Sequence, residues 1–313
     1  MKKSVIGVFL FVLLLQPAMG VKAQGQDYPT KPIQLLVGFA AGGLADTTAR
    51  ALAKQLEAAL GKPVLVVNKP GAGGALGVMA VKAAKPDGYT IGICPTVVYT
   101  YNPLVQKVQY SADDFKFFGA AGKTQEAFVS APDSPWKDFK GLVEYAKKHP
   151  GLSYASMQPV GDKIASYIAK KEGVQWRGIP TKGGEEVMTA ILGKHVDFGY
   201  SGGIHASFVR AGKMITLGGT GDKRLLGSPE VPTLQEQGYD VQIITYMLLS
   251  APKTTPDFII KKLEEASKRA AKDAAFVELL EKKLQVSAAY LDSGQTEEHL
   301  KSQIKMMKKL VQQ

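Results

Sequence analysis

Short apolar runs alternate with segments of helical period along most of this chain. In the first half, the runs IQLLV, VLVV and TIGIC are separated by TTARALAKQLEAAL and ALGVMAVKAA. A second round contains LSYAS, HVDFGY and MITLGG, with the helical segments DKIASYIAKKEG and EEVMTAILGK. Because strands joined through helices tend to pair in parallel, this alternation predicts an α/β protein with two blocks, each a mostly parallel sheet flanked by helices.

The pattern changes after about Val231. VQIITYMLLSAP is a long strand-like run, which we expect to cross back from the second block to the first. The helical segments that follow begin at Thr255, with Pro256 in the first turn, and they are amphipathic and rich in lysine. Such helices need an apolar surface to pack on, and we expect the first block to supply it.

The first residues have the layout of a secretory signal peptide. Lys2 and Lys3 precede an apolar run of 11 residues, and small residues follow near Ala23. That run is shorter than the roughly 20 residues that a membrane-spanning helix needs, and no later segment has 18 uninterrupted apolar residues. We therefore expect residues 1–23 to be removed and the mature protein to be soluble and exported.

Composition argues against several function classes. The formal charge is +11, but many of the lysines stand as pairs near glutamates, as on solvated helix faces, so we expect no nucleic-acid partner. Cys94 is the only cysteine and lies in the apolar run TIGIC, which favours a core position and leaves no internal disulfide. The histidines lack the short spacings of zinc sites, so we expect no metal and no cofactor; they are His149, His195, His205 and His299.

Three glycine-rich loops carry the main functional signal. FAAGGLAD, from Phe39 to Asp46, and NKPGAGGALG, from Asn68 to Gly77, each lie between a predicted strand and a helix. TKGG, from Thr181 to Gly184, precedes a helix in the second block. Strand-to-helix junctions of this kind present free backbone amides and the positive end of a helix dipole, and glycine lets an anion approach them. The loops therefore predict a pocket for a small anion, although each one alone is also consistent with a simple turn.

Motifs for nucleotide binding and hydrolysis fit less well. The glycine spacing from Gly71 to Gly77 misses the dinucleotide fingerprint, and FFGAAGKT lacks the first glycine of a phosphate-binding loop. GYSGG matches the G-x-S-x-G of a nucleophile elbow and lies between a strand-like and a helix-like segment. An exported serine hydrolase therefore stays open as an alternative. Its triad would be Ser201, His299 and either Asp222 or Asp257.

The chain resembles the substrate-binding proteins of tripartite tricarboxylate transporters, the Bug family. The similar pieces run in family order across nearly the whole mature chain: YPTKPIQLLVGFAAGGLADTTAR, GKPVLVVNKPGAGGALG, KPDGYTI, IPTKGGEE, GKHVDFGYSGG, SPEVPTLQEQGYD and APKTTPDFIIKKL. The resemblance implies a two-lobed periplasmic binding protein fold of type II, whose lobes close on a ligand by hinge motion. We expect one lobe to comprise residues 28–124 and 246–313, and the other residues 125–245.

The resemblance also implies where a ligand is held. Carried over onto this sequence, the expected ligand contacts are Phe39, Ala40, Gly42, Gly43, Asn68, Gly71, Ala72, Gly73, Thr96, Ser156, Met157, Gln158, Thr181, Gly183, Asp197 and Ser201. Asp46 has a different expected role, because its i to i+4 spacing with Arg50 favours bracing of the first glycine loop. Lys163 is a candidate partner for a second carboxylate or else a solvated helix residue.

Together these features predict a periplasmic binding protein of a Gram-negative bacterium rather than an enzyme. By resemblance, its ligand is a small carboxylate: a di- or tricarboxylate, an aromatic acid or an acidic amino acid. The expected partners are the permease subunits of a tripartite tricarboxylate-type transporter, and we expect a monomer. A solute receptor used for sensing is a second alternative, since the sequence does not separate sensing from transport.

Overall fold

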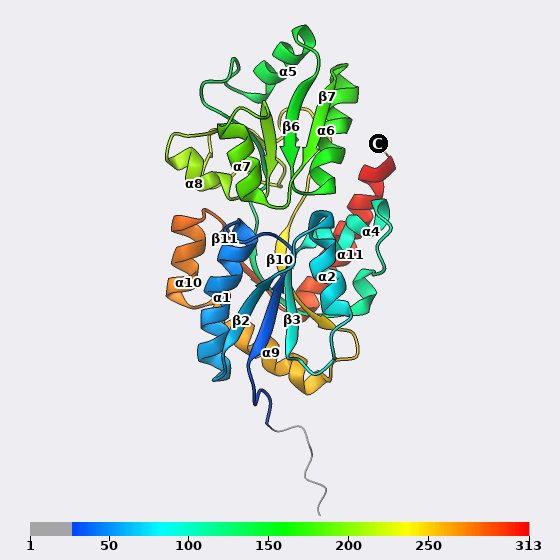
Figure 1. The fold of residues 1–313 in the computed structure, drawn as a ribbon, viewed down its shortest axis with the longest axis vertical. Helices are drawn as coiled ribbons and strands as arrows, with labels where there is room; N and C mark the ends of the chain where they lie inside the picture. The colour runs from blue at the N-terminus through cyan, green and yellow to red at the C-terminus, as the bar shows by residue number, and fades with distance from the viewer. Residues whose placement is uncertain (1–26, 313) are drawn as a thin grey trace, which may run out of the picture.

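Two sheets, one in each of two stacked lobes, organise the fold (Figure 1). The structure is a computed structural model that describes residues 27–312, so the expected signal peptide lies outside the described residues. Lobe 1 has a six-stranded sheet in the order β11-β4-β10-β3-β1-β2, and lobe 2 has a five-stranded sheet in the order β7-β6-β8-β5-β9. The strands of lobe 1 are β1 (Ile33–Val37), β2 (Val64–Asn68), β3 (Thr90–Pro95), β4 (Phe115–Lys123), β10 (Tyr246–Pro252) and β11 (Ser287–Leu291). Those of lobe 2 are β5 (Ala127–Ser130), β6 (Leu152–Ser156), β7 (Trp176–Pro180), β8 (Phe198–Ser201) and β9 (Ile215–Gly219).

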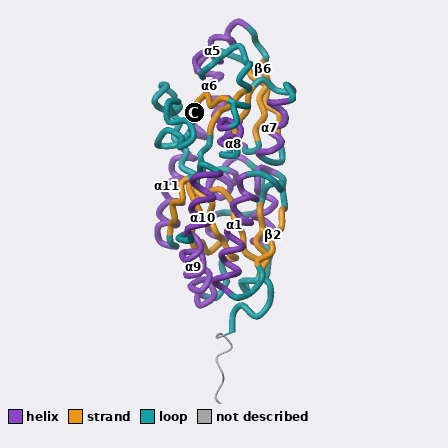
Figure 2. The backbone as a smooth tube through the Cα atoms, turned by 90° about the vertical axis from the view of Figure 1, so that its left-hand side faces the viewer, coloured by secondary structure: helices purple, strands orange, loops and turns teal. Residues whose placement is uncertain are grey.

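Helices cover both sheets, and most of them lie in lobe 1. That lobe carries α1 (Leu44–Leu60), η1 (Ala72–Gly74), α2 (Ala75–Lys82), α3 (Thr96–Thr100), α4 (Asn102–Val105), η2 (Ala112–Asp114), α9 (Asp257–Ala271), α10 (Ala274–Glu278), η3 (Leu279–Lys283) and α11 (Ser293–Gln312). Lobe 2 carries α5 (Phe139–Lys148), α6 (Pro159–Glu172), α7 (Gly184–Leu192) and α8 (His205–Arg210). Figure 2 shows α1, α9 and α10 together on one face of lobe 1, where the sequence predicted that the last helices pack.

Both sheets are mixed, and each has one antiparallel strand inside it. β1 pairs in parallel with β2 and β3, whereas β10 lies antiparallel between β3 and β4. In lobe 2, β6 pairs in parallel with β7 and β8, while β5 lies antiparallel between β8 and β9. β5 and β10 are the strands that the chain enters directly after it crosses from one lobe to the other. The predicted two-lobed α/β fold is confirmed, with the return strand β10 inside the first sheet.

The register of β1 and β2 places the first two glycine loops side by side. Val37, the last residue of β1, pairs with Asn68, the last residue of β2. Since both strands run the same way, the loops that leave them start at the same edge of the sheet. Helix α1 is fixed below the first loop by Leu52 and Leu56, which are fully buried, and it ends at Gly61 with φ 69°.

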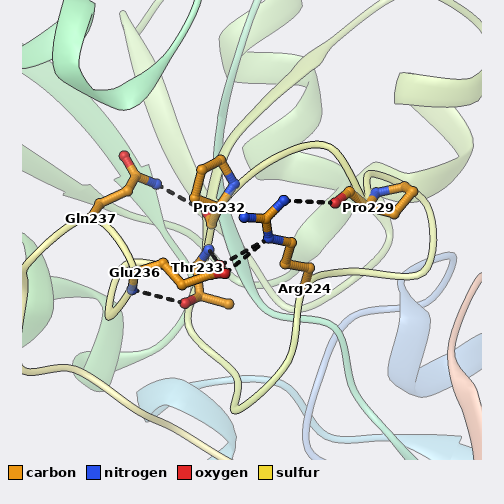
Figure 3. A network of polar contacts seen from close by, with 6 residues as sticks. All are labelled: Arg224, Pro229, Pro232, Thr233, Glu236 and Gln237. Atoms are coloured by element: carbon orange, nitrogen blue, oxygen red, sulfur yellow. Dashed lines mark hydrogen bonds and ion pairs between the residues drawn. The ribbon is translucent and has the colours of Figure 1, made fainter.

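The chain crosses between the lobes twice, and the two crossings lie together. Thr124 N donates to Thr245 O at 2.8 Å, and Ile243 N donates to Thr220 O at 2.6 Å. Between these points, residues 220–245 form a long connection without a helix or strand of their own. A polar network holds this connection: Arg224 Nε donates to both carboxylate oxygens of Glu236 at 3.0 Å, and Glu236 Oε2 accepts from Thr233 N at 2.7 Å (Figure 3).

Helix α11 joins the two lobes on one side. It packs on β4 and α3 in lobe 1 and rises to the side of α6 in lobe 2 (Figure 1). Met307 and Leu310 are buried in the apolar cluster of lobe 2, and Lys163 Nζ donates to Val311 O at 3.3 Å. None of the helices in the described residues is long and apolar enough to span a membrane.

Candidate ligand-binding cleft

The two lobes touch across a cleft that is lined by the glycine loops. Ala40 N in the first loop donates to Lys182 O in lobe 2 at 3.4 Å. The second loop lies against lobe 2 so closely that a Cβ on Gly73 would overlap Pro159. Between these contacts the cleft has two parts, which we name the inner chamber and the outer mouth. They share two lining residues, Met157 and Gln158.

The inner chamber is small and mostly apolar. Its volume is about 20 Å³, enough for about one water molecule. Glu126 is the one ionisable side chain among the described residues that line it, and Gln158 and Thr124 are the other polar ones. The lining consists of Phe39, Gly43, Leu44, Ala45, Pro95, Thr124, Glu126, Met157, Gln158, Gly184, Gly202, Ile204 and Met247.

The outer mouth is larger and more polar. Its volume is about 310 Å³, which matches the lower end of the pockets that hold small ligands. Glycine backbone forms one wall, and the loops after β6 and β7 form the other. The lining consists of Gly71, Ala72, Gly73, Gly74, Gln106, Ser156, Met157, Gln158, Pro159, Asp162, Pro180, Thr181 and Lys182.

Four helices begin at this cleft, two from each lobe. Leu44 of α1 and Gly184 of α7 line the inner chamber, while Gly74, which precedes α2, and Pro159 of α6 line the outer mouth. The first amides of each helix have no intrahelical acceptor, and each helix dipole places positive potential at its start. The cleft therefore offers an anion positive potential from fixed backbone groups.

Asp46 holds the first glycine loop in shape. Asp46 is only 3% exposed, and its carboxylate accepts hydrogen bonds from Gly42 N, Arg50 Nε and Asn68 Nδ2, each at 3.0 Å. Asn68 Nδ2 also donates to Phe39 O at 3.0 Å. Burial alone raises the pKa of Asp46, but the hydrogen bonds from Arg50, Gly42 and Asn68 outweigh it and lower the pKa below its usual value. The loop that lines the chamber is thus braced by a charged network behind it.

The second glycine loop has a backbone that only glycine adopts readily. Gly71, Gly73 and Gly74 have φ values of 133°, 60° and 94°, and Ala72 joins them at 49°. Asn102 Nδ2 fixes the loop from below by donating to Gly73 O at 3.0 Å. Successive residues in such conformations can form a concave surface of amides, which suits an anion.

Glu126 is a carboxyl held inside the cleft at the lobe crossing. It is 3% exposed, and its Oε2 accepts from Tyr200 Oη at 2.7 Å. Thr245 lies beside the same carboxyl, but neither its Oγ1 nor Glu126 Oε1 has a hydrogen bond of normal geometry. Burial raises the pKa of Glu126 to about 7, against the opposing effect of the Tyr200 and Thr245 hydroxyls. Near neutral pH this carboxyl can therefore both give and take a proton.

Gln158 lines both parts of the cleft and has a primary amide without a hydrogen-bond partner. Its backbone is tied by Ser156 Oγ, which donates to Gln158 O at 2.9 Å. Its side chain is buried, yet both Nε2 and Oε1 have no hydrogen-bond partner. A buried amide left unpaired at both ends costs free energy, so its place beside a cavity points to a missing partner.

Nine of the residues expected to contact a ligand line the cleft. Phe39, Gly43, Met157 and Gln158 line the inner chamber, and Gly71, Ala72, Gly73, Ser156, Met157, Gln158 and Thr181 line the outer mouth. Three more lie where the lobes meet: a Cβ on Gly183 would contact Ala40, and a Cβ on Gly42 would contact Glu185. These twelve residues are brought to one place by the fold.

The other four expected contacts have side chains that are engaged elsewhere. Asn68 braces the first loop, and Thr96 Oγ1 accepts from Tyr246 N at 3.1 Å and lies 2.9 Å from His299 Nε2. Ser201 Oγ is fully buried and lies 3.0 Å from His205 Nδ1. Asp197 precedes β8, at the end of that strand far from the cleft, where it accepts from Ser153 N at 2.7 Å. The expectation that Asp197 faces the cleft is wrong, because β8 runs toward the cleft and Asp197 stands at its start.

Two alternatives that the sequence left open are not supported by the packing. Lys163 points to the end of α11 rather than to a ligand. The alternative triad around Ser201 is not assembled: His299 contacts Thr96, Asp222 pairs with Lys123, and Asp257 pairs with Lys116.

Several cleft residues were missed by the sequence reasoning. Glu126, Leu44, Ile204 and Met247 line the inner chamber, and Lys182 and Asp162 line the outer mouth. Glu126 lies in KTQEAF, which has no motif and no periodic signal of a site. Lys182 was within reach of sequence reasoning, because it stands inside the glycine loop TKGG that was already singled out.

Comparison with known proteins decides the family. Residues 48–313 match the tripartite tricarboxylate transporter family receptor. The chain belongs to this family. A UPF0065 protein from the gbd 5' region of Cupriavidus necator is 34% identical over 299 residues, covering 94% of this chain and 91% of that protein.

Solved structures of related proteins share the fold of this family member. The periplasmic binding protein BugD superposes with a TM-score of 0.84 at 29% identity, covering 91% of this chain and 98% of BugD. MatC from Rhodopseudomonas palustris with bound malate superposes with a TM-score of 0.83 at 24% identity, covering 91% of this chain and 100% of MatC. Both likenesses confirm the two-lobed periplasmic binding protein fold, and the match to a family of transporter receptors supports a substrate-binding role.

Proposed function

We propose that this receptor binds a small carboxylate between its lobes in the periplasm and delivers it to the permease subunits of a tripartite tricarboxylate-type transporter. Family membership supports the transport role. The observation that carries the ligand class is the convergence of four helix starts, α1, α2, α6 and α7, on one cleft. Fixed backbone dipoles of this kind favour an anion without a dedicated arginine.

The outer mouth is the place for the ligand's carboxylate. Its 310 Å³ accommodates a ligand of a few carbon atoms, and its glycine wall leaves the backbone open to close approach. Lys182 adds one positive side chain at the rim. Met157 and Gln158 then connect this carboxylate to the inner chamber.

Hinge motion at the two lobe crossings is part of the proposal. The crossings are short paired segments, with Thr124 bound to Thr245, so a small rotation there separates the lobes. Contacts such as Ala40 N to Lys182 O form only when the lobes meet. A ligand that bridges both walls stabilises the contact form by its differential affinity.

A thermal-shift screen of the ligand-free mature protein tests this function. The panel contains mono-, di- and tricarboxylates, aromatic acids, acidic amino acids and, as controls, neutral sugars and cationic amines. We expect the melting temperature to rise with ligand concentration as ln(1 + [L]/Kd) for at least one carboxylate. A rise with neutral or cationic solutes alone would contradict the anion-binding role.

A further inference from the structure

The inner chamber differs from an anion pocket, and its chemistry narrows the ligand class beyond a small carboxylate. With about 20 Å³ it accepts a group of about the size of one water molecule, which is too little for the three heavy atoms of a carboxylate. Its walls bring no cationic side chain among the described residues, and they do bring Glu126. A second carboxylate placed here would face that buried acid without a neutralising charge.

Two acceptors on residues that line the chamber have no hydrogen bond of normal geometry. These are Glu126 Oε1 and Gln158 Oε1, on residues that are 3% and 2% exposed. Tyr200 Oη donates to Glu126 Oε2, and the Thr245 hydroxyl lies beside the same carboxyl without a partner of normal geometry, so Oε1 can still accept from a ligand. What fits this arrangement is a small group that donates hydrogen bonds.

The amide of Gln158 links this donor group to the carboxylate in the mouth. Its Oε1 can accept a hydrogen bond while its Nε2 donates one, and both atoms are on the same carbon. Because Gln158 lines both parts of the cleft, the two ligand groups that it binds must be close neighbours. A hydroxyl or an ammonium on the carbon next to a carboxylate has this geometry.

We propose that the preferred ligand is a 2-hydroxy or 2-amino carboxylate, whose hydroxyl or ammonium enters the inner chamber and donates to Glu126 Oε1 and Gln158 Oε1. The inference rests on the proposed function and assigns Glu126 as a specificity-determining residue. Because burial raises the pKa of Glu126 to about 7, both the ionised and the neutral form exist near neutral pH. The ionised carboxylate can accept a hydrogen bond from an ammonium, and an oxygen of the neutral carboxyl can accept one from a hydroxyl.

Matched ligand series test this proposal by isothermal titration calorimetry on the mature protein. Succinate, malate and aspartate differ only by hydrogen, hydroxyl or ammonium at one carbon. Propionate, lactate and alanine, and glutarate, 2-hydroxyglutarate and glutamate, repeat the comparison at other lengths. We expect a donor-bearing member of at least one series to bind about 10- to 100-fold more tightly than its unsubstituted parent, as for a hydrogen bond to a charged group.

Variants of Glu126 separate the two donors. Glu126→Gln keeps an acceptor without charge, so we expect it to reduce preference for an ammonium by about 10-fold or more and to affect a hydroxyl less. Glu126→Met removes one of the two acceptors, and we expect it to reduce both preferences, with Gln158 Oε1 left as the remaining acceptor. Since Glu126→Met leaves the buried Tyr200 hydroxyl unpaired, the double variant with Tyr200→Phe removes both partners and serves if the single variant does not fold.

Glu144→Gln is the matched control. Glu144 is an exposed side chain on α5 and lines neither part of the cleft, so the preference should not change. Equal affinity for the unsubstituted and substituted acids in every series, or a preference that Glu126→Met leaves unchanged, would overturn the inference and leave the proposed function standing. If no carboxylate of any kind binds the wild-type protein, the proposed function itself fails.

Discussion

The inner chamber and the outer mouth are neighbours that share Met157 and Gln158, and they use opposite means of recognition. The mouth is built from glycine backbone and the starts of α2 and α6, so its positive potential comes from fixed backbone groups. The chamber meets the starts of α1 and α7, but most of its lining consists of apolar side chains around one buried acid. The difference suggests that holding a carboxylate and choosing among carboxylates are assigned to separate parts of one cleft. Four predictions test that division, from the largest expected effect to the smallest.

The first prediction concerns the free energy of unfolding that is lost because Glu126 is buried in the inner chamber. The pKa of Glu126 is about 7 in the folded protein, against an ordinary value of 4.5, so between these pH values the folded protein holds a proton that the unfolded chain has lost. The free energy of unfolding therefore falls as pH rises from 4.5 to 7, and the loss reaches about 3 kcal/mol at about 1.4 kcal/mol per pKa unit. We expect Glu126→Gln to remove this loss, so that the variant is more stable than wild type at pH 8 and not at pH 4.

Urea denaturation of the ligand-free protein at pH 4, 6 and 8 measures this effect. If the difference in the free energy of unfolding between variant and wild type does not change over this pH range, Glu126 is charged or solvated in the folded state. In that case the chamber would be a polar pocket like the mouth.

The second prediction concerns the backbone wall of the mouth. A Cβ on Gly73 would overlap Pro159 of lobe 2, so Gly73→Ala should keep the lobes apart at this point. We expect weaker binding by about 1–3 kcal/mol, the usual cost of overpacking a close contact, for all carboxylates alike. Affinity measurements on one tight ligand and its weaker analogues show how much affinity is lost and whether the loss is the same for every carboxylate.

Gly61→Ala is the control for this variant. Gly61 also has a positive φ, of 69°, but no atom lies within 4 Å of a Cβ placed there. It should lose stability through backbone strain without a change in ligand affinity. Equal affinity loss in both variants would mean that strain rather than lobe contact was measured.

The third prediction concerns the brace behind the first glycine loop. Asp46→Ala removes the acceptor of three hydrogen bonds, and we expect a loss of about 1–2 kcal/mol in the free energy of unfolding. Because the folded-state pKa of Asp46 is lowered, its contribution is complete above pH 3.8 and is lost as pH falls through the folded-state value. The difference in the free energy of unfolding between variant and wild type should be smaller at pH 3 than at pH 7, whereas the exposed Asp113→Ala should show no difference at either pH.

The fourth prediction concerns the one positive side chain at the rim of the mouth. Lys182 is exposed, so water and salt screen its charge. We expect Lys182→Gln to weaken carboxylate binding by less than about 1 kcal/mol, with the difference disappearing at high salt. The exposed Lys140 on α5 provides the matched Lys140→Gln control. A large, salt-independent loss at Lys182 would show that a side chain rather than the backbone holds the carboxylate.

The sequence by itself determined the two-lobed α/β fold and the three glycine loops of the cleft. Apolar runs of strand length, alternating with helical segments, specify which residues must be buried, and glycines mark where the backbone needs positive φ. Family resemblance then pointed to twelve residues that the fold brings together. These signals depend only on neighbouring residues in the sequence, so they can be recognised without the tertiary structure.

Only the tertiary structure decided which side chains line the cleft. Ser201 is the last residue of β8 and Asp197 stands just before its first, so the direction of the strand puts Asp197 far from the cleft. Glu126 has no local signal, because its role arises from burial between two lobe crossings and from Tyr200, 74 residues away. Burial, a raised pKa and an unpaired oxygen depend on what surrounds a residue in space, and that is decided when distant segments pack together.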